Sequence, residues 1–205
     1  MKQISRVYST YSKKHISSLP TPSILLDLNT LNKNVANHSN LLSCANQNIK
    51  VRHHTEWHRT FQIAELLLKP TSTNGAIAVS RISDALFYEK SKKFSNIFYN
   101  NPITQDKLYD ANYLNEFTNF CFEVDCDAQL RMIRHFVQRN SRSKFSILPR
   151  ISVRDPIGLD YLNEETFRFV AVAHKTQNVN LVGLSFHHDE RKCSASELLS
   201  VIKSV

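Results

Sequence analysis

Residues 75–88 read GAIAVSRISDALFY and contain one complete β-then-α unit. The first six residues, GAIAVS, form a short apolar run that predicts a strand. After this run, the apolar side chains of Ile82, Ala85, Leu86 and Tyr88 recur at the spacing of an amphipathic helix. The stretch therefore predicts a strand that leads directly into a helix.

The same alternation repeats along the chain from Leu19 onward. Strands are predicted at seven places: residues 23–28, 50–56, 75–80, 96–99, 118–124, 145–153 and 181–186. An amphipathic helix is predicted after every strand except the fourth, and Asp127 is expected to cap the helix that follows residues 118–124. Because parallel strands are joined through crossover connections, this order predicts an α/β protein with a parallel sheet.

The shortage of glycine decides between the two architectures that bury a parallel sheet. A doubly wound sheet that binds dinucleotides carries GxGxxG after its first strand, and this chain has only three glycines, none in such a motif. We therefore predict a TIM-like (β/α) barrel over residues 19–205, incomplete because it has about seven β/α units and no visible eighth strand. Its two exposed parallel edges would be covered by a protein partner or a second copy of the chain.

Composition indicates a soluble globular protein of one domain or at most two small ones. The chain has 205 residues, of which 41% are hydrophobic and 21% charged. It contains no run of 18 apolar residues, so no membrane span is expected. The four cysteines form no CxxC pair, which is typical of free thiols in a reducing compartment.

The first 18 residues, MKQISRVYSTYSKKHISS, are basic, rich in hydroxyl side chains and free of acidic residues. These features are typical of a mitochondrial presequence. The alternative is a disordered basic tail on a cytoplasmic protein. Removal of a presequence would take away about half of the net charge of +8 and weaken the case for general nucleic-acid binding.

Residues 51–59 read VRHHTEWHR and place three of the nine histidines around one carboxylate. In an extended segment, one face would carry four polar side chains, namely Arg52, His54, Glu56 and His58. Trp57 would point to the other face, where we expect it to pack under the following helix. Such a polar row on a strand indicates a site, the remnant of one, or a solvated edge.

Two imidazoles and a carboxylate suit Zn²⁺ or Fe²⁺. A row at alternate positions is about 13 Å long, however, so one of these histidines paired with His187 across the barrel is a more economical metal site. The plainer interpretation is a salt bridge from Glu56 to one of three arginines, Arg52, Arg150 or Arg154.

Several short segments, taken in order, carry a family resemblance. They are residues 19–28 (LPTPSILLDL), the row from Arg52 to Arg59 followed by Ile63-Ala64, residues 75–80 (GAIAVS) with Ser83-Asp84-Ala85, residues 96–102 (NIFYNNP), residues 122–125 (FEVD) with Gln129-Leu130, and residues 182–187 (VGLSFH). Together they resemble the D-threonine aldolases and eukaryotic D-serine dehydratases, which are pyridoxal-phosphate enzymes with the alanine racemase-like (fold type III) barrel. The resemblance covers residues 19–188 and implies the same barrel here.

The sequence departs from that family at the cofactor site. The position that matches the family's cofactor lysine is Glu56, and a carboxylate cannot form the Schiff base that an amine forms with an aldehyde. Where the family binds the cofactor phosphate, the sequence reads His188-Asp189-Glu190 and so places two acids. The family's C-terminal β domain is also absent from the sequence.

The resemblance therefore implies a site without a catalytic residue. It leaves a remnant of the cofactor site in four side chains: Arg52, His54, His58 and His187. We expect that no cofactor binds. If one does bind, the resemblance implies that it is pyridoxal phosphate. We predict a non-catalytic pseudoenzyme, a degenerate homologue of pyridoxal-phosphate-dependent D-amino-acid lyases and aldolases that acts through protein or RNA contacts, as a subunit of a mitochondrial assembly.

Two alternative functions remain open at this point. The first is a D-serine dehydratase-like or D-threonine aldolase-like lyase that still binds pyridoxal phosphate, and the second is a metal-dependent hydrolase.

Glu123 and Asp125, at the end of one strand, could serve acid–base chemistry or be solvated. RNA contact would use the basic residues of one helix and the following loop, namely Arg131, Arg134, Arg139, Arg142 and Lys144, which could equally be a solvated helix face.

Overall fold

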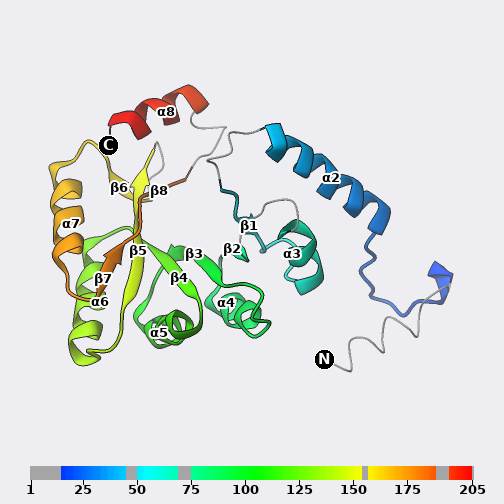
Figure 1. Cartoon of the computed structure of the whole chain (residues 1–205), viewed down its shortest axis with the longest axis horizontal. Helices are drawn as coiled ribbons and strands as arrows, with labels where there is room; N and C mark the ends of the chain where they lie inside the picture. Colours follow the sequence, from blue (N-terminus) through cyan, green and yellow to red (C-terminus); the bar gives the residue numbers. More distant parts are fainter. Residues whose placement is uncertain (1–14, 45–49, 69–74, 154–156, 188–193, 205) are drawn as a thin grey trace. The chain divides into compact units, whose positions relative to one another are not determined.

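The computed structural model describes residues 15–44, 50–68, 75–153, 157–187 and 194–204. The chain divides into two compact units, Met1–Cys44 and Ala45–Val205 (Figure 1). The predicted presequence lies almost entirely outside the described residues. No helix in the described ranges is both long and apolar enough to span a membrane.

The first unit contains a short 3-10 helix, η1 (Ile16–Ser18), and one long helix, α2 (Leu28–Cys44). The strand predicted at residues 23–28 is wrong: residues 23–27 have no regular structure, and the Ile24 side chain is fully exposed. Asp27 begins the helix instead, because its carboxylate accepts the backbone N–H of Asn29 and of Thr30, at 2.9 and 3.3 Å. A hydrogen bond from the Thr30 hydroxyl, together with these two backbone bonds, lowers the pKa of Asp27.

The second unit is built on a parallel sheet. Five strands lie side by side in chain order: β1 (His53–His54), β2 (Ala76–Val79), β3 (Asn96–Pro102), β4 (Asn119–Val124) and β5 (Phe145–Ser152). Three shorter strands each pair in parallel with β5: β6 (Leu159–Asp160), β7 (Val179–Leu181) and β8 (Ser185–Phe186). The predicted α/β class and parallel sheet are confirmed.

Two further strand predictions need correction, and one strand was not predicted. The second strand, predicted at residues 50–56, is only His53–His54, and the seventh, predicted at 181–186, is divided into β7 and β8. The division falls at Gly183, whose φ of 152° is a conformation that side chains with a Cβ rarely adopt. The two-residue strand β6 was not expected, because residues 159–160 have too few neighbours of strand-forming type to predict it.

Helices connect the strands, as expected for crossover connections. They are α3 (Phe61–Leu68), α4 (Ile82–Glu89), α5 (Leu108–Phe117) after the 3-10 turn η2 (Gln105–Lys107), α6 (Asp127–Arg139), α7 (Glu164–Lys175) and α8 (Ala195–Ser204). Helix α5 was not predicted. Asp127 is the first residue of α6 and not its cap; Cys126 precedes it, and the Gln129 side chain accepts the Asp125 N–H at 2.8 Å.

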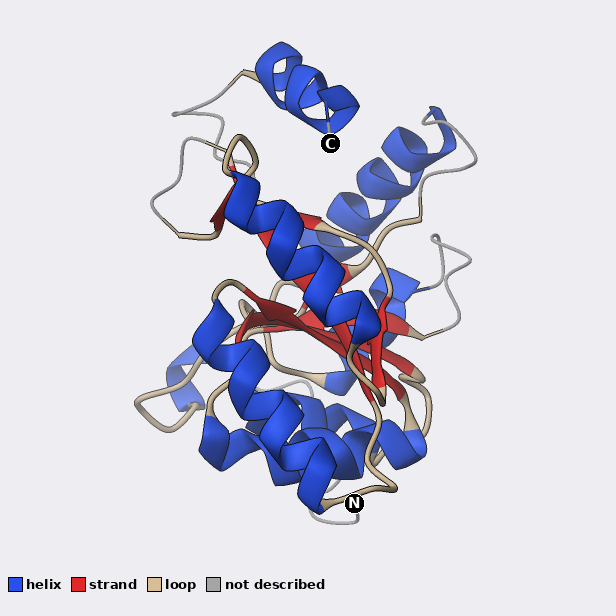
Figure 2. Cartoon of the chain, turned by 90° about the vertical axis from the view of Figure 1, so that its left-hand side faces the viewer, coloured by secondary structure: helices blue, strands red, loops and turns tan. Residues whose placement is uncertain are grey.

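The core lies between the helices and one face of the sheet (Figure 2). The strand residues on this face are apolar and almost fully buried: Ile77, Val79, Ile97, Tyr99, Phe120, Phe122, Phe145 and Ile147. The alternate residues form what we call the inner face. One register row across it reads His54, Ala78, Phe98, Cys121, Ser146 and Asn180. This face is largely polar, which is unusual for a closed barrel interior packed with branched apolar side chains.

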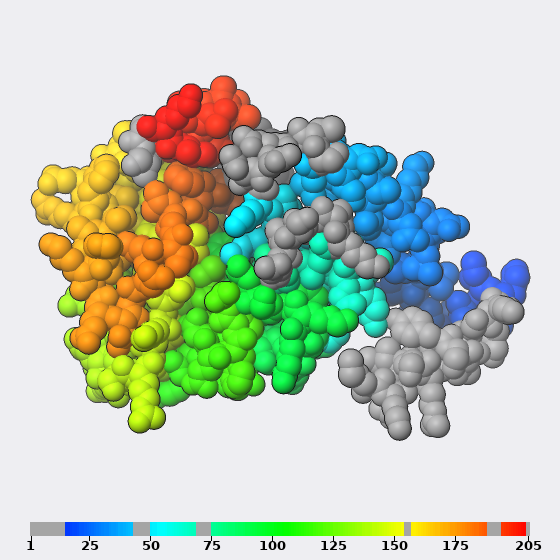
Figure 3. All heavy atoms as spheres, in the orientation of Figure 1, coloured from blue at the N-terminus to red at the C-terminus, as the bar shows by residue number. Residues whose placement is uncertain are grey.

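The sheet does not close. Within the described ranges, β1 forms one edge and β7 with β8 forms the other, with no further strand paired to either. The prediction of an incomplete TIM-like barrel is therefore confirmed. Beyond the carboxyl ends of β5 and β8, Val201 of α8 packs with Val153 and Phe186 in a second, small apolar cluster (α8 is red in Figure 3).

Candidate functional site

The segment VRHHTEWHR is a short strand followed by a turn. The buried Thr55 donates its backbone N–H to Ala78 O at 3.0 Å, and its own carbonyl accepts the N–H groups of His58 and Arg59. These bonds close a turn over residues 56–58, so the predicted polar row ends at His54 and does not reach His58. Trp57 lies on this turn and is 91% exposed, so the prediction that it packs under the following helix is wrong.

Glu56 lies at the carboxyl end of β1 in a small polar cluster. Its Oε2 accepts the Ser80 hydroxyl at 2.9 Å and lies 3.8 Å from His54 Nδ1. His54 Nε2 lies 2.8 Å from the Asn100 amide nitrogen, and Asn101 donates to Ser80 O at 2.7 Å. The Glu56 backbone N–H donates to His54 Nδ1 at 3.4 Å, so the imidazole of His54 contacts both Glu56 and Asn100.

The expected salt bridge from Glu56 to Arg52 or Arg150 does not form, and Arg154 lies outside the described residues. Arg52 lies two residues before His54, toward the amino end of the inner face. Its Nη1 is 4.0 Å from Cys121 Sγ, and its guanidinium carbon lies 5.9 Å from the centre of the Phe98 ring. Burial raises the pKa of the Cys121 thiol and outweighs the opposite effect of Arg52.

His58 is separate from this cluster. Its Nδ1 accepts the Thr60 backbone N–H at 3.2 Å, and its half-buried ring has a lowered pKa because burial disfavours the charged form. His58 therefore stabilises the turn as a neutral imidazole. Of the four predicted remnant residues, only His54 lies beside Glu56.

A second cluster surrounds Glu123, in β4. Its side chain is 6% exposed, and its carboxylate accepts Arg150 Nη1 at 3.3 Å and the Ser185 hydroxyl at 2.5 Å. Burial raises the pKa of Glu123, while Ser185, Arg150 and the charge of His187 act in the opposite direction. The prediction of a solvated pair with Asp125 is wrong, because Glu123 is buried against an arginine.

These residues do not suit a metal ion or pyridoxal phosphate. In the described part of the chain, no group of three or more histidine, cysteine, aspartate or glutamate side chains could hold a metal ion. None of the inner-face strand positions carries a lysine. Two carboxylates, Glu56 and Glu123, lie at the carboxyl end of the sheet, and Glu123 balances the charge of Arg150. A dianionic phosphate therefore meets no excess of positive charge among them.

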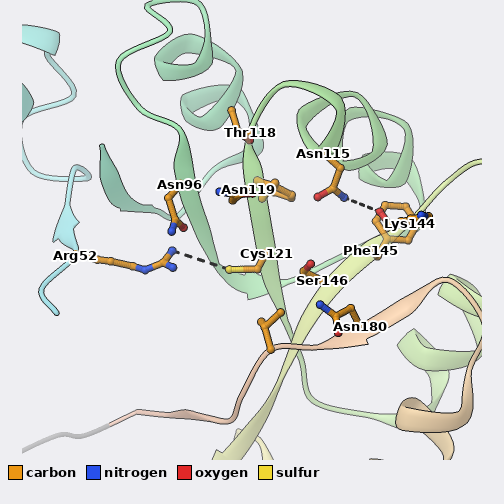
Figure 4. A pocket seen from close by; sticks show the side chains of 12 residues that line it. Arg52, Asn96, Asn115, Thr118, Asn119, Cys121, Lys144, Phe145, Ser146 and Asn180 are labelled. Atoms are coloured by element: carbon orange, nitrogen blue, oxygen red, sulfur yellow. Dashed lines mark hydrogen bonds between the residues drawn. The ribbon is translucent and has the colours of Figure 1, made fainter. Parts of the chain in front are cut away.

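A cavity that the sequence did not predict lies at the other end of the inner face. Its volume is about 520 Å³, and it is lined by polar side chains together with Phe120, Phe145 and Val182 (Figure 4). The polar residues are Arg52 just before β1, Asn115 of α5, Asn96 of β3, Asn119 of β4, Ser146 of β5 and Asn180 of β7. Lys144, just before β5, also lines the cavity. The sequence held one hint of this cavity: β3 and β4 each begin with an asparagine, although apolar strands were expected there.

The five basic residues predicted to contact RNA lie along α6 and in the connection that follows it. Arg131 is one turn from Asp127, 3.9 Å from its carboxylate. Arg134 lines a groove of about 280 Å³ between α6 and α7, together with Lys175 and Asn178. Arg139, Arg142 and Lys144 lie at or after the end of α6, at the amino end of β5.

No protein-family model matches the sequence, and no curated protein matches it. Solved structures with the alanine racemase-like fold do resemble it. An alanine racemase-like protein from Idiomarina loihiensis has a TM-score of 0.73 at 21% identity, covering 92% of this chain and 49% of its own. D-threo-3-hydroxyaspartate dehydratase from Delftia sp. HT23 has a TM-score of 0.72 at 16% identity, covering 91% and 49%. D-threonine aldolase from Filomicrobium marinum has a TM-score of 0.69 at 18% identity, covering 82% and 44%.

These comparisons establish the fold. The chain has the alanine racemase-like barrel, as the sequence resemblance implied. It spans about half the length of these structures, and identities of 16–21% carry no conclusion about activity.

Proposed function

We propose that this chain is a non-catalytic relative of the pyridoxal-phosphate-dependent D-amino-acid lyases and aldolases, and that it acts by binding a protein or RNA partner. The observation that carries the proposal is Glu56. Where the resemblance places a lysine, this side chain is a carboxylate that accepts the Ser80 hydroxyl and faces His54. It cannot supply the amine on which cofactor chemistry in this family depends.

The second carboxylate supports the same proposal. Glu123 and Arg150 neutralise one another with side chains that are 6% and 10% exposed. An anionic cofactor would have to compete with Glu123 for the arginine, which costs the energy of the buried pair. Arg150 therefore already has a countercharge without a ligand.

The test is the absorption spectrum of the purified chain after incubation with pyridoxal phosphate and dialysis. We expect no visible band and no change in Trp57 fluorescence; Trp57 is the single tryptophan and lies beside Glu56. A retained band would contradict the proposal. Glu56→Lys, with Glu56→Gln as its matched control, asks whether an amine alone restores binding, and we expect that it does not because Glu123 remains.

A second candidate function is a lyase that still binds pyridoxal phosphate. The observation that favours it is the likeness to D-threonine aldolase and D-threo-3-hydroxyaspartate dehydratase. Because Glu56 occupies the position that the resemblance gives to the amine, another side chain would have to supply it. A saturable visible band in the wild-type chain, together with release of ammonia or glycine from a D-hydroxyamino acid, would establish this function.

We also propose that the protein acts in mitochondria, as a subunit of a larger assembly. The support is the basic, acid-free composition of residues 1–18. Residues 1–18 fused to a fluorescent protein should direct it to mitochondria, and a diffuse cytoplasmic signal would contradict this proposal.

A further inference from the structure

Three connections lie side by side at the amino end of the sheet: residues 115–119, 139–145 and 175–179. Asn115 Nδ2 donates to Lys144 O at 2.9 Å, which joins the first connection to the second. Asn178 joins the third to the second, since its carbonyl accepts the Phe145 N–H at 2.9 Å and its amide donates to Ser141 O at 3.0 Å. These bonds make the three connections one fixed surface, which we call the amino-end platform.

The platform is basic. It contains one acidic residue, Glu116, and four basic residues, Arg139, Arg142, Lys144 and Lys175. None of the four basic side chains forms an ion pair with a residue in the described ranges. Arg139 and Lys175 lie in the last turns of α6 and α7, where the helix dipole favours a positive charge. Arg142 and Lys144 lie beyond the end of α6, so the dipole does not explain why these positions are basic.

The cavity of about 520 Å³ opens beside the platform, and its wall is rich in amide groups. No acidic side chain lines it. An asparagine amide presents one acceptor and two donor hydrogens, the groups that pair with the edges of unstacked bases. The volume falls within the range of small-molecule and cofactor pockets, so an extruded base could enter it.

An exposed aromatic pair lies at the end of α5, and one of its members, Phe117, belongs to the first connection of the platform. Phe117 and Tyr113, on the last turns of α5, are 57% and 44% exposed, and their ring centres lie 4.9 Å apart. Phe117 directly precedes Thr118, which lines the cavity. Exposed rings beside cations are the usual stacking sites for the bases of single strands.

From this combination we propose that the amino-end platform binds single-stranded nucleic acid. The cations contact phosphates, Phe117 stacks on one base, and the asparagine-lined cavity receives another. An acidic polypeptide would use the cations but neither the ring nor the amides, which is why nucleic acid is the better match. The proposal rests on the proposed non-catalytic function and names the partner class for it.

The experiment measures binding of a labelled oligo(U) and oligo(dT) of about 12 nucleotides, a length within the usual range of single-strand sites. With four phosphate contacts, the slope of log K against log salt should be about −3 for single strands. The double variant Arg142→Ser/Lys144→Ser loses two of the four contacts and should reduce this slope to about −1.5. Phe117→Ala should weaken binding at least about fivefold, the smallest loss typical of a stacked base.

The control is Arg168→Ser/Lys203→Ser, which removes the same charge from exposed sites on α7 and α8 and should leave the salt slope unchanged. Three outcomes would overturn the proposal: no binding of either oligonucleotide, equal losses in the control and platform variants, or full displacement by polyglutamate with no effect of Phe117→Ala. Circular dichroism of each variant verifies folding.

The two proposals can fail separately. The absorption spectrum with pyridoxal phosphate tests the absence of cofactor chemistry, whereas oligonucleotide binding tests only the platform. A chain with no visible band and no oligonucleotide binding would retain the first proposal and lose the second.

Discussion

At the carboxyl end of the sheet several charged side chains form ion pairs, whereas those of the amino-end platform do not. Glu123 pairs with Arg150, and Asp84 lies 3.0 Å from Arg81 and 3.6 Å from Arg59. The four basic residues of the amino-end platform have no such partner in the described ranges. The comparison teaches that, at the end where this fold class carries its site, carboxylates and arginines pair with one another, whereas the unpaired cations of the platform lie at the opposite end.

This difference predicts opposite responses to mutation. Removing one member of a buried pair leaves an uncompensated charge, so substitutions at the carboxyl end should reduce stability. Removing an exposed, unpaired cation relieves repulsion and should leave stability nearly unchanged while reducing binding. The predictions below run from the largest expected effect to the smallest.

Glu123→Leu should have the largest effect. Arg150 would remain buried with its main countercharge lost, and an arginine cannot deprotonate, so the free energy of unfolding should fall by about 3–5 kcal/mol. Urea unfolding followed by circular dichroism measures it. The double variant Glu123→Leu/Arg150→Met should recover most of the loss, because no buried charge is left. A double variant as unstable as Glu123→Leu would show that the pair stabilises by more than mutual compensation.

Arg150→Met should cost less, about 2 kcal/mol at neutral pH, because Glu123 can bind a proton. The pKa of Glu123 is already above its ordinary value of 4.5, and loss of Arg150 should raise it further. The folded state then binds a proton more tightly than the unfolded state, so the lost stability should return as the pH falls from neutral toward 4.5. Unfolding curves across that range check the sign, and a further loss on acidification would contradict it.

The strands and helices that form the core were predictable because their signal is local. The apolar runs at Ala76–Val79 and Asn119–Val124 lie where the pattern placed them. Helix α5 was missed because its buried residues, Leu108, Ala111 and Leu114, are separated by polar side chains that resemble a loop. The strand predicted at residues 23–28 failed for the opposite reason: its pattern is apolar, but a strand needs a partner, and residues 23–27 have none in the described part of the chain.

The candidate site was less predictable than the fold. The alternation that placed His58 beside Glu56 assumed an extended chain, but the hydrogen bonds of Thr55 turn it after His54. Glu123 was expected in solvent because its partner Arg150 lies 27 residues away, on another strand. The cavity at the amino end depends on six segments that meet only in the folded sheet, so no local pattern could indicate it.

Asp84→Asn should have an intermediate effect, a loss of about 1–2 kcal/mol. The side chain is 12% exposed, accepts two bonds from Arg81, and lies in the first turn of α4, where a negative charge is favourable. It also faces Arg59, whose φ of 44° is uncommon for a residue with a side chain. Thermal unfolding measures the loss, and Glu164→Gln, which breaks an exposed pair with Arg168, is the matched control and should cost less than half as much.

Arg142→Ser/Lys144→Ser should have the smallest effect on stability, within about 0.5 kcal/mol of the wild type. The sign of this change in stability distinguishes the two ends of the barrel. Unpaired cations close together repel one another, so the double variant should be slightly more stable than the wild type at low ionic strength. Salt screens that repulsion within a Debye length of about 8–10 Å, and the advantage should vanish near physiological ionic strength. Unfolding curves at both ionic strengths check this. A double variant that is less stable at low salt would mean that these side chains have partners in the folded chain, and the contrast between the two ends would then be lost.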